Sequence, residues 1–424
     1  MTASADRARL LSWPTRDRHM LIVDILATAF AVALPWSTSA TEILVWLWLI
    51  AAVPLLDPAA LRRVLKTPAG GLPILFLLLG LVGMLWAFGV PMKERLDGFK
   101  SFYKFLFVPL LIAHFLMSKR GAWVLIGYLA SCCVLLVVSG LTLIPGFPWQ
   151  GRNGPGFPVR DSIAQSGEFI VCIFVFAAIA LDAWKNRRPA WAVLLSVLIL
   201  LFLVNILALP AISRTSFVVL PVLVLLFGFR CLSRKGAAAV VLCGFVVAGL
   251  AWSFSLSFRE NVTSLISEVQ NFESRGDRTR AGERIEFWKK SAGFVAAAPV
   301  IGHGTGSIRD QFRHTVANQT GMAALASSNP HNQTFAVAIQ LGLVGTVVLW
   351  AMWIAHLLLF RAEGLAAWVG LVIVTQNVVG SLFNSHLFDF TQGWGYVMGV
   401  GVAAGMVLQQ TGQCQAAGGR DASP

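Results

Sequence analysis

Long apolar stretches alternate along the chain with short connections that carry most of its charge. Each stretch has roughly 15 to 25 residues, about the length that an α-helix needs to cross ~30 Å of hydrocarbon. Twelve are present, at positions 20–36, 43–56, 72–91, 105–117, 122–145, 163–181, 190–209, 216–229, 237–256, 333–360, 364–384 and 393–409. Because a helix satisfies its own backbone in lipid, the pattern predicts an all-α polytopic membrane protein with about twelve transmembrane helices.

Composition supports this class and argues against two others. Of the 424 residues, 57% are hydrophobic and only 12% are charged, so a soluble domain could not cover its surface. We expect a single membrane domain over residues 1–424. The net charge of +13 lies in short connections and forms no basic stripe interleaved with exposed aromatic residues, which argues against nucleic-acid binding. The cysteines lie in apolar stretches or in the C-terminal tail, so no disulfide framework is predicted.

Positive charges are unequally shared between the two sides of the predicted bundle. An even number of helices places both termini on one side, which holds 17 Lys/Arg and 7 Asp/Glu against 16 and 13 on the other side. Since Lys and Arg accumulate in cytoplasmic connections, both termini are predicted to be cytoplasmic.

One connection on the external side, residues 257–330, is far longer than the others. Long connections without a function are uncommon. Apolar residues recur there at helical spacing, first at Val262, Leu265, Ile266 and Val269 and again between residues 285 and 295. We therefore predict a long periplasmic loop with two amphipathic helices that rest on the membrane surface.

The sharpest polar motif lies where this loop meets the tenth predicted helix. In the run 328–332, Ser-Asn-Pro-His-Asn, a capping residue and a proline predict a helix start with His331 in the first turn. The positive end of the helix dipole disfavours imidazolium, so a neutral imidazole able to accept a proton is expected near pH 7. At about 100° per residue, Gly342 and Gly345 would continue the same helix face. Small residues at this spacing also serve helix packing in lipid, so a structural interpretation stays open.

Two segments resemble motifs of the O-antigen ligase family. His331-Asn332, nine residues and Gly342-Leu343-Val344-Gly345 are similar to the family's histidine motif at all four fixed positions. Residues 283–288 followed by 299–306 resemble a stretch shared by O-antigen ligases and polymerases. Twelve helices with one long periplasmic loop are similar to the ligases over essentially the whole chain.

The resemblance implies a GT-C-like glycosyltransferase that uses no nucleotide sugar and no cofactor. Its donor would be O-antigen on undecaprenyl pyrophosphate, and its acceptor a sugar hydroxyl of lipid A–core, at the periplasmic face of the bacterial inner membrane. By position, His331 is implied as the general base, with Arg214 and Arg284 binding the pyrophosphate. Guanidinium groups bind phosphate oxygens in paired bonds, and the chain contains no Asp-x-Asp motif, so we expect chemistry without a metal.

Further polar residues are weaker candidates for substrate binding. Arg95, Lys104 and Arg160 are expected near the external surface, where each could equally contact lipid headgroups. Asn332 follows the histidine in its motif, and Asp389 precedes the last helix, from which it could assist the base. Glu168, inside the sixth predicted helix, is a candidate because intramembrane carboxylates are costly.

Three other activities fit parts of the pattern. An O-antigen polymerase has a related architecture, but the complete histidine motif and the basic loop favour a ligase. A protein O-oligosaccharyltransferase is expected to have extra periplasmic sequence after its last helix, where this chain has only a short polar tail. A secondary transporter typically shows two similar halves with broken helices at the midplane. No such repeat is visible, and the candidate polar groups gather near one surface.

Overall fold

The computed structural model describes residues 15–149, 154–159, 161–209, 213–275, 279–316 and 324–418, and over these residues its regular elements are all helices, with no strands. The helices are α2 (Arg16–Ala33), α3 (Thr38–Ala52), η1 (Val53–Leu55), α4 (Pro58–Leu65), α5 (Pro68–Val82), α6 (Met92–Phe99), η2 (Tyr103–Leu106), α7 (Phe107–Met117), α8 (Gly121–Leu141), α9 (Ser162–Lys185), α10 (Pro189–Ala208), α11 (Ser216–Cys231), α12 (Arg234–Phe254), α13 (Leu256–Arg275), α14 (Arg280–Ala297), α15 (Ile308–Val316), α16 (Gln333–Leu359), α17 (Leu365–Gly380) and α18 (Phe390–Gly418). Each of the twelve apolar stretches overlaps one of these helices, so the all-α polytopic prediction is confirmed.

Within the described residues, seven helices are long and apolar enough to cross a membrane. An eighth span results if α4 and α5 are counted together, although they are bent by 83° relative to each other. The bend arises because Thr67 and Pro68 start a new helix directly after α4: the Thr67 hydroxyl caps α5, and the proline takes its first position. Helices α11 and α17 are apolar but shorter. The count of twelve spans therefore stays a prediction.

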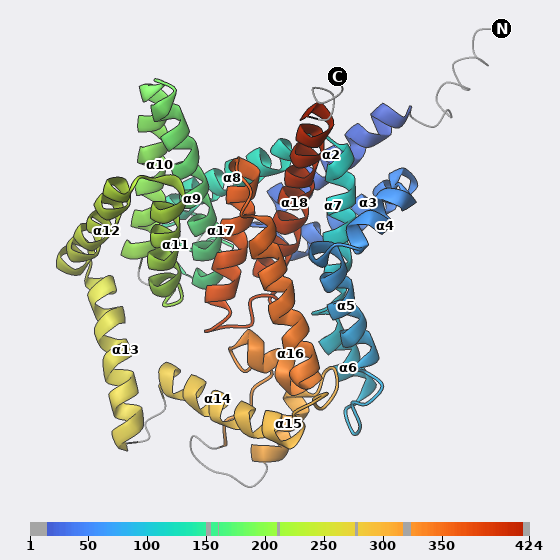
Figure 1. Ribbon diagram of the computed structural model, residues 1–424. Helices are drawn as coiled ribbons and strands as arrows, with labels where there is room; N and C mark the ends of the chain where they lie inside the picture. Colours follow the sequence, from blue (N-terminus) through green and yellow to red (C-terminus); the bar gives the residue numbers. More distant parts are fainter. Residues whose placement is uncertain are drawn as a thin grey trace.

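The segment between α12 and α16 forms one end of the molecule (Figure 1). Helix α13 extends away from the bundle, and α14 and α15 lie across its end, with α14 packed against α16. The start of α2 and the end of α18 lie at the opposite end (Figure 1). Helices α13 and α14 occupy the two stretches predicted to be amphipathic, whereas α15 was not predicted. We refer below to this end of the molecule as the α14 end.

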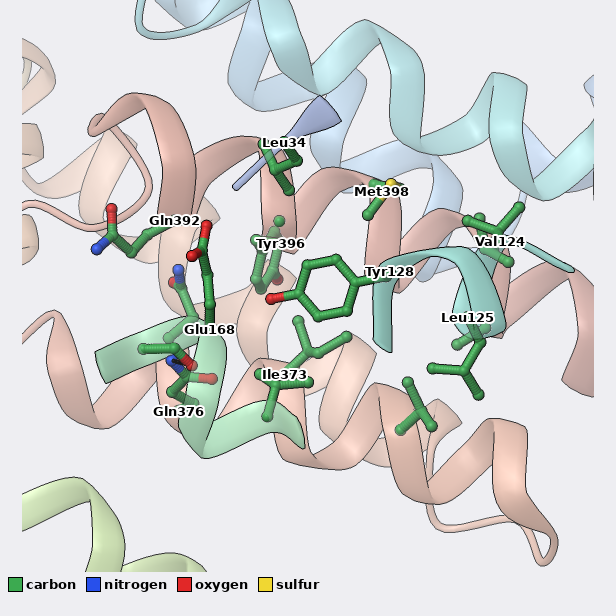
Figure 2. A pocket seen from close by; sticks show the side chains of 18 of the residues that line it. Leu34, Val124, Leu125, Tyr128, Glu168, Ile373, Gln376, Gln392, Tyr396 and Met398 are labelled. Carbon is green, nitrogen blue, oxygen red and sulfur yellow. Dashed lines mark hydrogen bonds between the residues drawn. The ribbon is translucent and has the colours of Figure 1, made fainter. Parts of the chain in front are cut away.

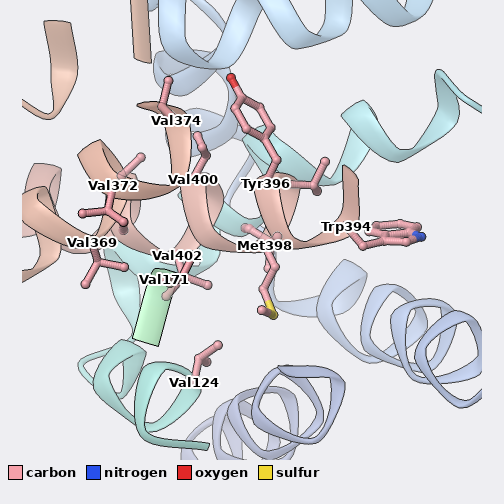
Figure 3. Packing of buried hydrophobic residues seen from close by; sticks show 14 of the residues in the cluster. Val124, Val171, Val369, Val372, Val374, Trp394, Tyr396, Met398, Val400 and Val402 are labelled. Carbon is pink, nitrogen blue, oxygen red and sulfur yellow. The ribbon is translucent and has the colours of Figure 1, made fainter. Parts of the chain in front are cut away.

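The core is built around α18, which packs on α7 and α17. Figure 3 shows valines of α17 and α18 interleaving beside Tyr396 and Met398. Trp394 is 1% exposed and meets the rings of Phe30 and Phe107 edge-on. Close packing of this kind fixes α17 and α18 against each other, and with them the connection 381–389 that joins them at the α14 end.

Helix α16 is broken at Gly342, where φ is 59° and ψ is −153°. The segment 299–306, which links α14 to α15, runs against the break. A Cβ atom at Gly342 would lie 2.4 Å from the Val300 carbonyl oxygen, so only glycine fits this approach. The prediction of one straight stripe through His331, Gly342 and Gly345 is wrong, because the helix changes direction along it.

Four backbone hydrogen bonds join the segment 299–306 to the broken helix. The N–H groups of Leu343 and Val344 donate to carbonyls 299 and 300, at 2.8 and 3.2 Å. In return, the N–H groups of His303 and Gly304 donate to carbonyls 339 and 340, at 2.8 and 2.9 Å. Irregular backbone at membrane depth is tolerated where protein satisfies it in this way.

Candidate functional site

His331 lies just before α16 and not inside its first turn. The N-cap is Asn332, whose Oδ1 accepts the Phe335 N–H at 3.0 Å, and the helix begins at Gln333. His331 itself has a left-handed backbone, with φ of 52°. Asn329 holds this conformation, because its Oδ1 accepts the His331 N–H at 2.8 Å. The prediction that Pro330 opens the helix is therefore wrong, although His331 still lies next to the N-terminus of α16.

The residues around His331 are joined to the α17–α18 connection by several hydrogen bonds. The Gln333 N–H donates to the Ser381 carbonyl at 2.9 Å, and the Gln333 Oε1 accepts the Leu387 N–H at 3.0 Å. The Asn332 amide donates to the Leu382 carbonyl at 3.0 Å. The Ser385 hydroxyl donates to Asn329 Oδ1 at 2.7 Å. These bonds hold the segment 329–333 and the connection 381–389 together as one unit.

The imidazole of His331 is enclosed on two sides. Its ring stacks on Phe287 of α14, with centroids 6.1 Å apart and an interplanar angle of 23°. Its Nδ1 lies 3.1 Å from Asn384 Oδ1. Partial burial lowers the pKa of His331, the bond to Asn384 raises it, and the positive charge of Arg284 lowers it further. The net lowering favours a neutral imidazole near pH 7, the state that can accept a proton.

The two arginines of the predicted site have different surroundings. Arg284 lies in the second turn of α14, close enough to His331 for its charge to affect the histidine. Arg214, just before α11, instead forms a two-pronged ion pair with Glu268 of α13, at 2.8 and 2.7 Å. Glu268 also accepts the Ala281 N–H in the first turn of α14 at 3.1 Å. A carboxylate thus occupies the position between a guanidinium and a helix N-terminus, where an anionic group would also bind.

Two of the weaker candidates have partners within the protein. Arg95 donates to the carbonyls of Met84 and Val90, both at 2.9 Å, and so supports the turn between α5 and α6. Lys104 is 3% exposed and donates to the carbonyls of Leu387 and Asp389 at 3.1 and 3.0 Å. These bonds suit structural roles, and substrate contacts by either residue stay predictions. Arg160 lies outside the described residues.

Asp389 ends the α17–α18 connection and lies close to the histidine. Its Oδ2 accepts the Asn384 amide at 3.1 Å. Burial raises the pKa of Asp389 to about 6, while the charge of Lys104 opposes this rise and the like charge of Asp161 adds to it. The carboxyl group is thus mainly ionised at neutral pH and becomes protonated in mild acid.

A polar cavity of about 330 Å³ opens beside these residues. The segment before His331 lines it together with Phe388 and Asp389, and Glu94 of α6 and Arg309 of α15 also line it. Carboxylate, amide and hydroxyl groups next to an aromatic face suit a polyhydroxylated ligand such as a sugar.

A second cavity, of about 190 Å³, lies within the bundle and is mainly apolar. Figure 2 shows the Tyr128 ring reaching across it, with its hydroxyl toward the side where Glu168 and Gln376 lie. Gln376 donates to the Gly167 carbonyl at 2.8 Å and so joins α17 to α9. His386, also in the wall, is 3% exposed, and neither ring nitrogen has a hydrogen-bond partner within the described residues. This cavity brings the predicted Glu168 close to the α17–α18 connection but not into contact with His331.

Sequence reasoning missed three residues that shape the site, namely Phe287, Asn384 and Glu268. The only signal for Asn384 was the polar run 384–386 at the end of an apolar stretch. The other two lie on predicted amphipathic helices, whose contacts a linear pattern does not reveal. Among the described residues, no group of three or more His, Cys, Asp and Glu side chains is placed to hold a metal ion.

Residues 206–350 match the family model described as O-antigen ligase. This range includes Arg214, Arg284 and His331, together with α13, α14, α15 and the break in α16. The family resemblance predicted from the sequence motifs is thereby confirmed. No curated protein matches the chain.

Proposed function

We propose that the protein is an O-antigen ligase of the bacterial inner membrane, because residues 206–350 match the O-antigen ligase family model. The donor is O-antigen polysaccharide on undecaprenyl pyrophosphate, and the acceptor is a sugar hydroxyl of lipid A–core. The α14 end faces the periplasm, and both termini are cytoplasmic. One observation carries the proposal: within the matched range, His331 lies against α14, whose Arg284 affects it electrostatically.

The proposed reaction is a single displacement at the anomeric carbon of the donor. The acceptor oxygen attacks this carbon while its proton passes to Nε2 of His331, and the bond from carbon to phosphate oxygen breaks. Undecaprenyl pyrophosphate leaves with the bonding electron pair, and the configuration at the anomeric carbon inverts. A positioned base typically contributes ~10²- to 10⁴-fold to such a step.

Arginines stabilise the leaving group in this proposal. The pyrophosphate gains negative charge as the bond breaks, and fixed positive groups aimed at developing charge lower the barrier. Arg284 lies close enough to His331 for its charge to affect the imidazole. Arg214 also binds the pyrophosphate once a phosphate oxygen replaces the Glu268 carboxylate as its partner. The polar cavity lined by residues 328–330 and Asp389, next to His331 in the chain, suits the sugar of the acceptor.

The test is ligation with both purified lipids and purified protein in detergent. His331→Ala should still bind the donor but ligate at least ~100-fold more slowly, and the native rate should fall at acid pH as the imidazole is protonated. Arg284→Lys keeps the charge but loses the planar fork, so the rate should drop strongly. An Ala variant that retains most of its turnover would refute the role of His331.

The same assay separates the ligase from its alternatives. A polymerase would lengthen the polysaccharide when the donor is supplied alone, whereas a ligase requires lipid A–core. A secondary transporter would join nothing, and detergent leaves no gradient for it to use. Activity that persists in chelator supports the proposed metal-free chemistry, and loss rescued by one divalent ion contradicts it.

A further inference from the structure

Three side chains form a hydrogen-bonded row beside the α14 end. His331 Nδ1 lies 3.1 Å from Asn384 Oδ1, and Asn384 Nδ2 lies 3.1 Å from Asp389 Oδ2. Asn384 is 8% exposed, so water contributes little to its hydrogen bonding. The row runs from the α17–α18 connection to the segment before α16, two parts of the fold that the backbone N–H and the side-chain Oε1 of Gln333 already hold together.

The carboxylate at one end determines the direction of every hydrogen bond in the row. An ionised carboxylate only accepts, so the Asn384 side facing Asp389 must be the NH₂ group. The amide oxygen then faces His331, and because this oxygen only accepts, the proton must reside on Nδ1 of the imidazole. A rotated amide would place its oxygen against the carboxylate and lose that bond, and its NH₂ group would then face Nδ1 and favour the other tautomer.

From this geometry we infer that Asn384 is a positioning residue, which keeps His331 in the Nδ1-protonated tautomer and leaves the lone pair on Nε2 to receive the acceptor proton. The inference rests on the proposed role of His331 as base. Among the described residues Nε2 has no hydrogen-bond partner, and the His331 side chain is only part-buried, so a substrate hydroxyl can approach it. The wrong tautomer would present an N–H group to that hydroxyl and could not accept its proton.

The amide also keeps the carboxylate charge one side chain away from the imidazole. A carboxylate in direct contact stabilises imidazolium strongly, as in serine protease triads. Here the charged groups around His331 are Arg284 and Glu283 of α14, and beyond Asn384 lie Asp389 and, from η2, Lys104. An amide spacer orients the ring without raising its pKa as much as a carboxylate would. The base thus stays unprotonated near neutral pH.

Two substitutions at Asn384 test the inference through different readouts. Asn384→Ala removes the acceptor for Nδ1–H, so kcat at saturating lipids should fall by at least ~10-fold and at most by the whole ~10²- to 10⁴-fold contribution of a positioned base. Asn384→Asp keeps an acceptor, so kcat should stay above that of the Ala variant. Its negative charge should shift the acid limb of the pH–rate profile to higher pH. Asn205→Asp is the matched control, because the Asn205 amide is part-buried in α10 and bonds to Ser139. Its profile should keep the native midpoint.

Nitrogen-15 spectra of histidine-labelled protein provide a readout that does not need activity. The His331 signal is assigned as the one that is lost in His331→Ala. In the native protein this signal should be typical of protonated Nδ1, and Asn384→Ala should shift it toward the other tautomer. The inference would be overturned if both Asn384 variants showed the native kcat, pH profile and tautomer signal while His331→Ala was inactive. If His331→Ala retains most of its turnover, the proposed role of His331 as base itself fails. The two failures are therefore distinguishable.

Discussion

Replacing Lys104 by methionine tests how the α17–α18 connection is held in place. Methionine keeps most of the apolar stem but removes the ammonium group, which donates to the carbonyls of Leu387 and Asp389 at 3.1 and 3.0 Å and weakly to that of Phe388 at 3.4 Å. Bonds from a charged donor contribute about 1.5–3 kcal/mol each, so two well-formed bonds amount to about 3–6 kcal/mol. The buried Asp389 would also lose the positive charge that favours its ionised form.

Two measurements check this expectation. The free energy of unfolding in detergent should fall by about 3–6 kcal/mol, close to the ~3–5 kcal/mol typical when one partner of a buried charge pair is removed. Ligation should fall as well, because the loosened connection carries Asn384 and Asp389. Lys100→Met is the matched control: Lys100 is exposed and forms an ion pair with Asp97 three positions earlier, its one ion pair among the described residues, so its loss should leave both measurements unchanged. Native stability and rate in Lys104→Met would show that other contacts hold the connection.

Three further predictions address other parts of the molecule. Glu268→Gln should weaken the ion pair with Arg214 and lower the apparent KM for the donor severalfold, whereas Glu260→Gln on the same helix should leave this KM unchanged. An unchanged or higher KM in Glu268→Gln would show that the ion pair is purely structural. Gly342→Ala should destabilise the protein by ~1–3 kcal/mol or more, because alanine disfavours this backbone conformation and its Cβ would meet Val300. Gly140→Ala, the control, has open space around the added Cβ and should have little effect. A cysteine at the exposed position Ser267, in a cysteine-free background, should react with an impermeant thiol reagent in intact spheroplasts, and reaction only after lysis would reverse the proposed orientation.

The helices could be predicted from the sequence because each depends on a continuous apolar stretch. A span buries its side chains in lipid or against neighbours along its whole length, so its signal is local. The position of His331 could not be predicted in the same way. Asn329 and Asn332 are both capable N-caps, and the choice of Asn332 follows from the bond between Asn329 and the His331 N–H and from contacts with residues 381–389.

Contacts between distant parts of the chain explain the other errors and omissions. Arg214 and Glu268 lie 54 positions apart, and His331 and Asn384 lie 53 apart. The break at Gly342 depends on the approach of the segment 299–306, about 40 residues earlier, which no helical periodicity indicates. The sequence motif includes glycine at this position, but a straight helix and a broken one place the same residue type there for different reasons.

The backbone contacts between the segment 299–306 and the break in α16 limit how this protein can be recombined with relatives. A chimera that exchanged the α13–α15 segment alone would bring a foreign backbone against residues 339–344, where four reciprocal N–H to carbonyl bonds and the close approach at Gly342 depend on matched shapes. A crossover after residue 345 would transfer both partners of this contact together with His331 and Arg284. Exchange of donor preference between such enzymes should therefore succeed as one block, from α13 through the first half of α16, and fail when it is divided at residue 330.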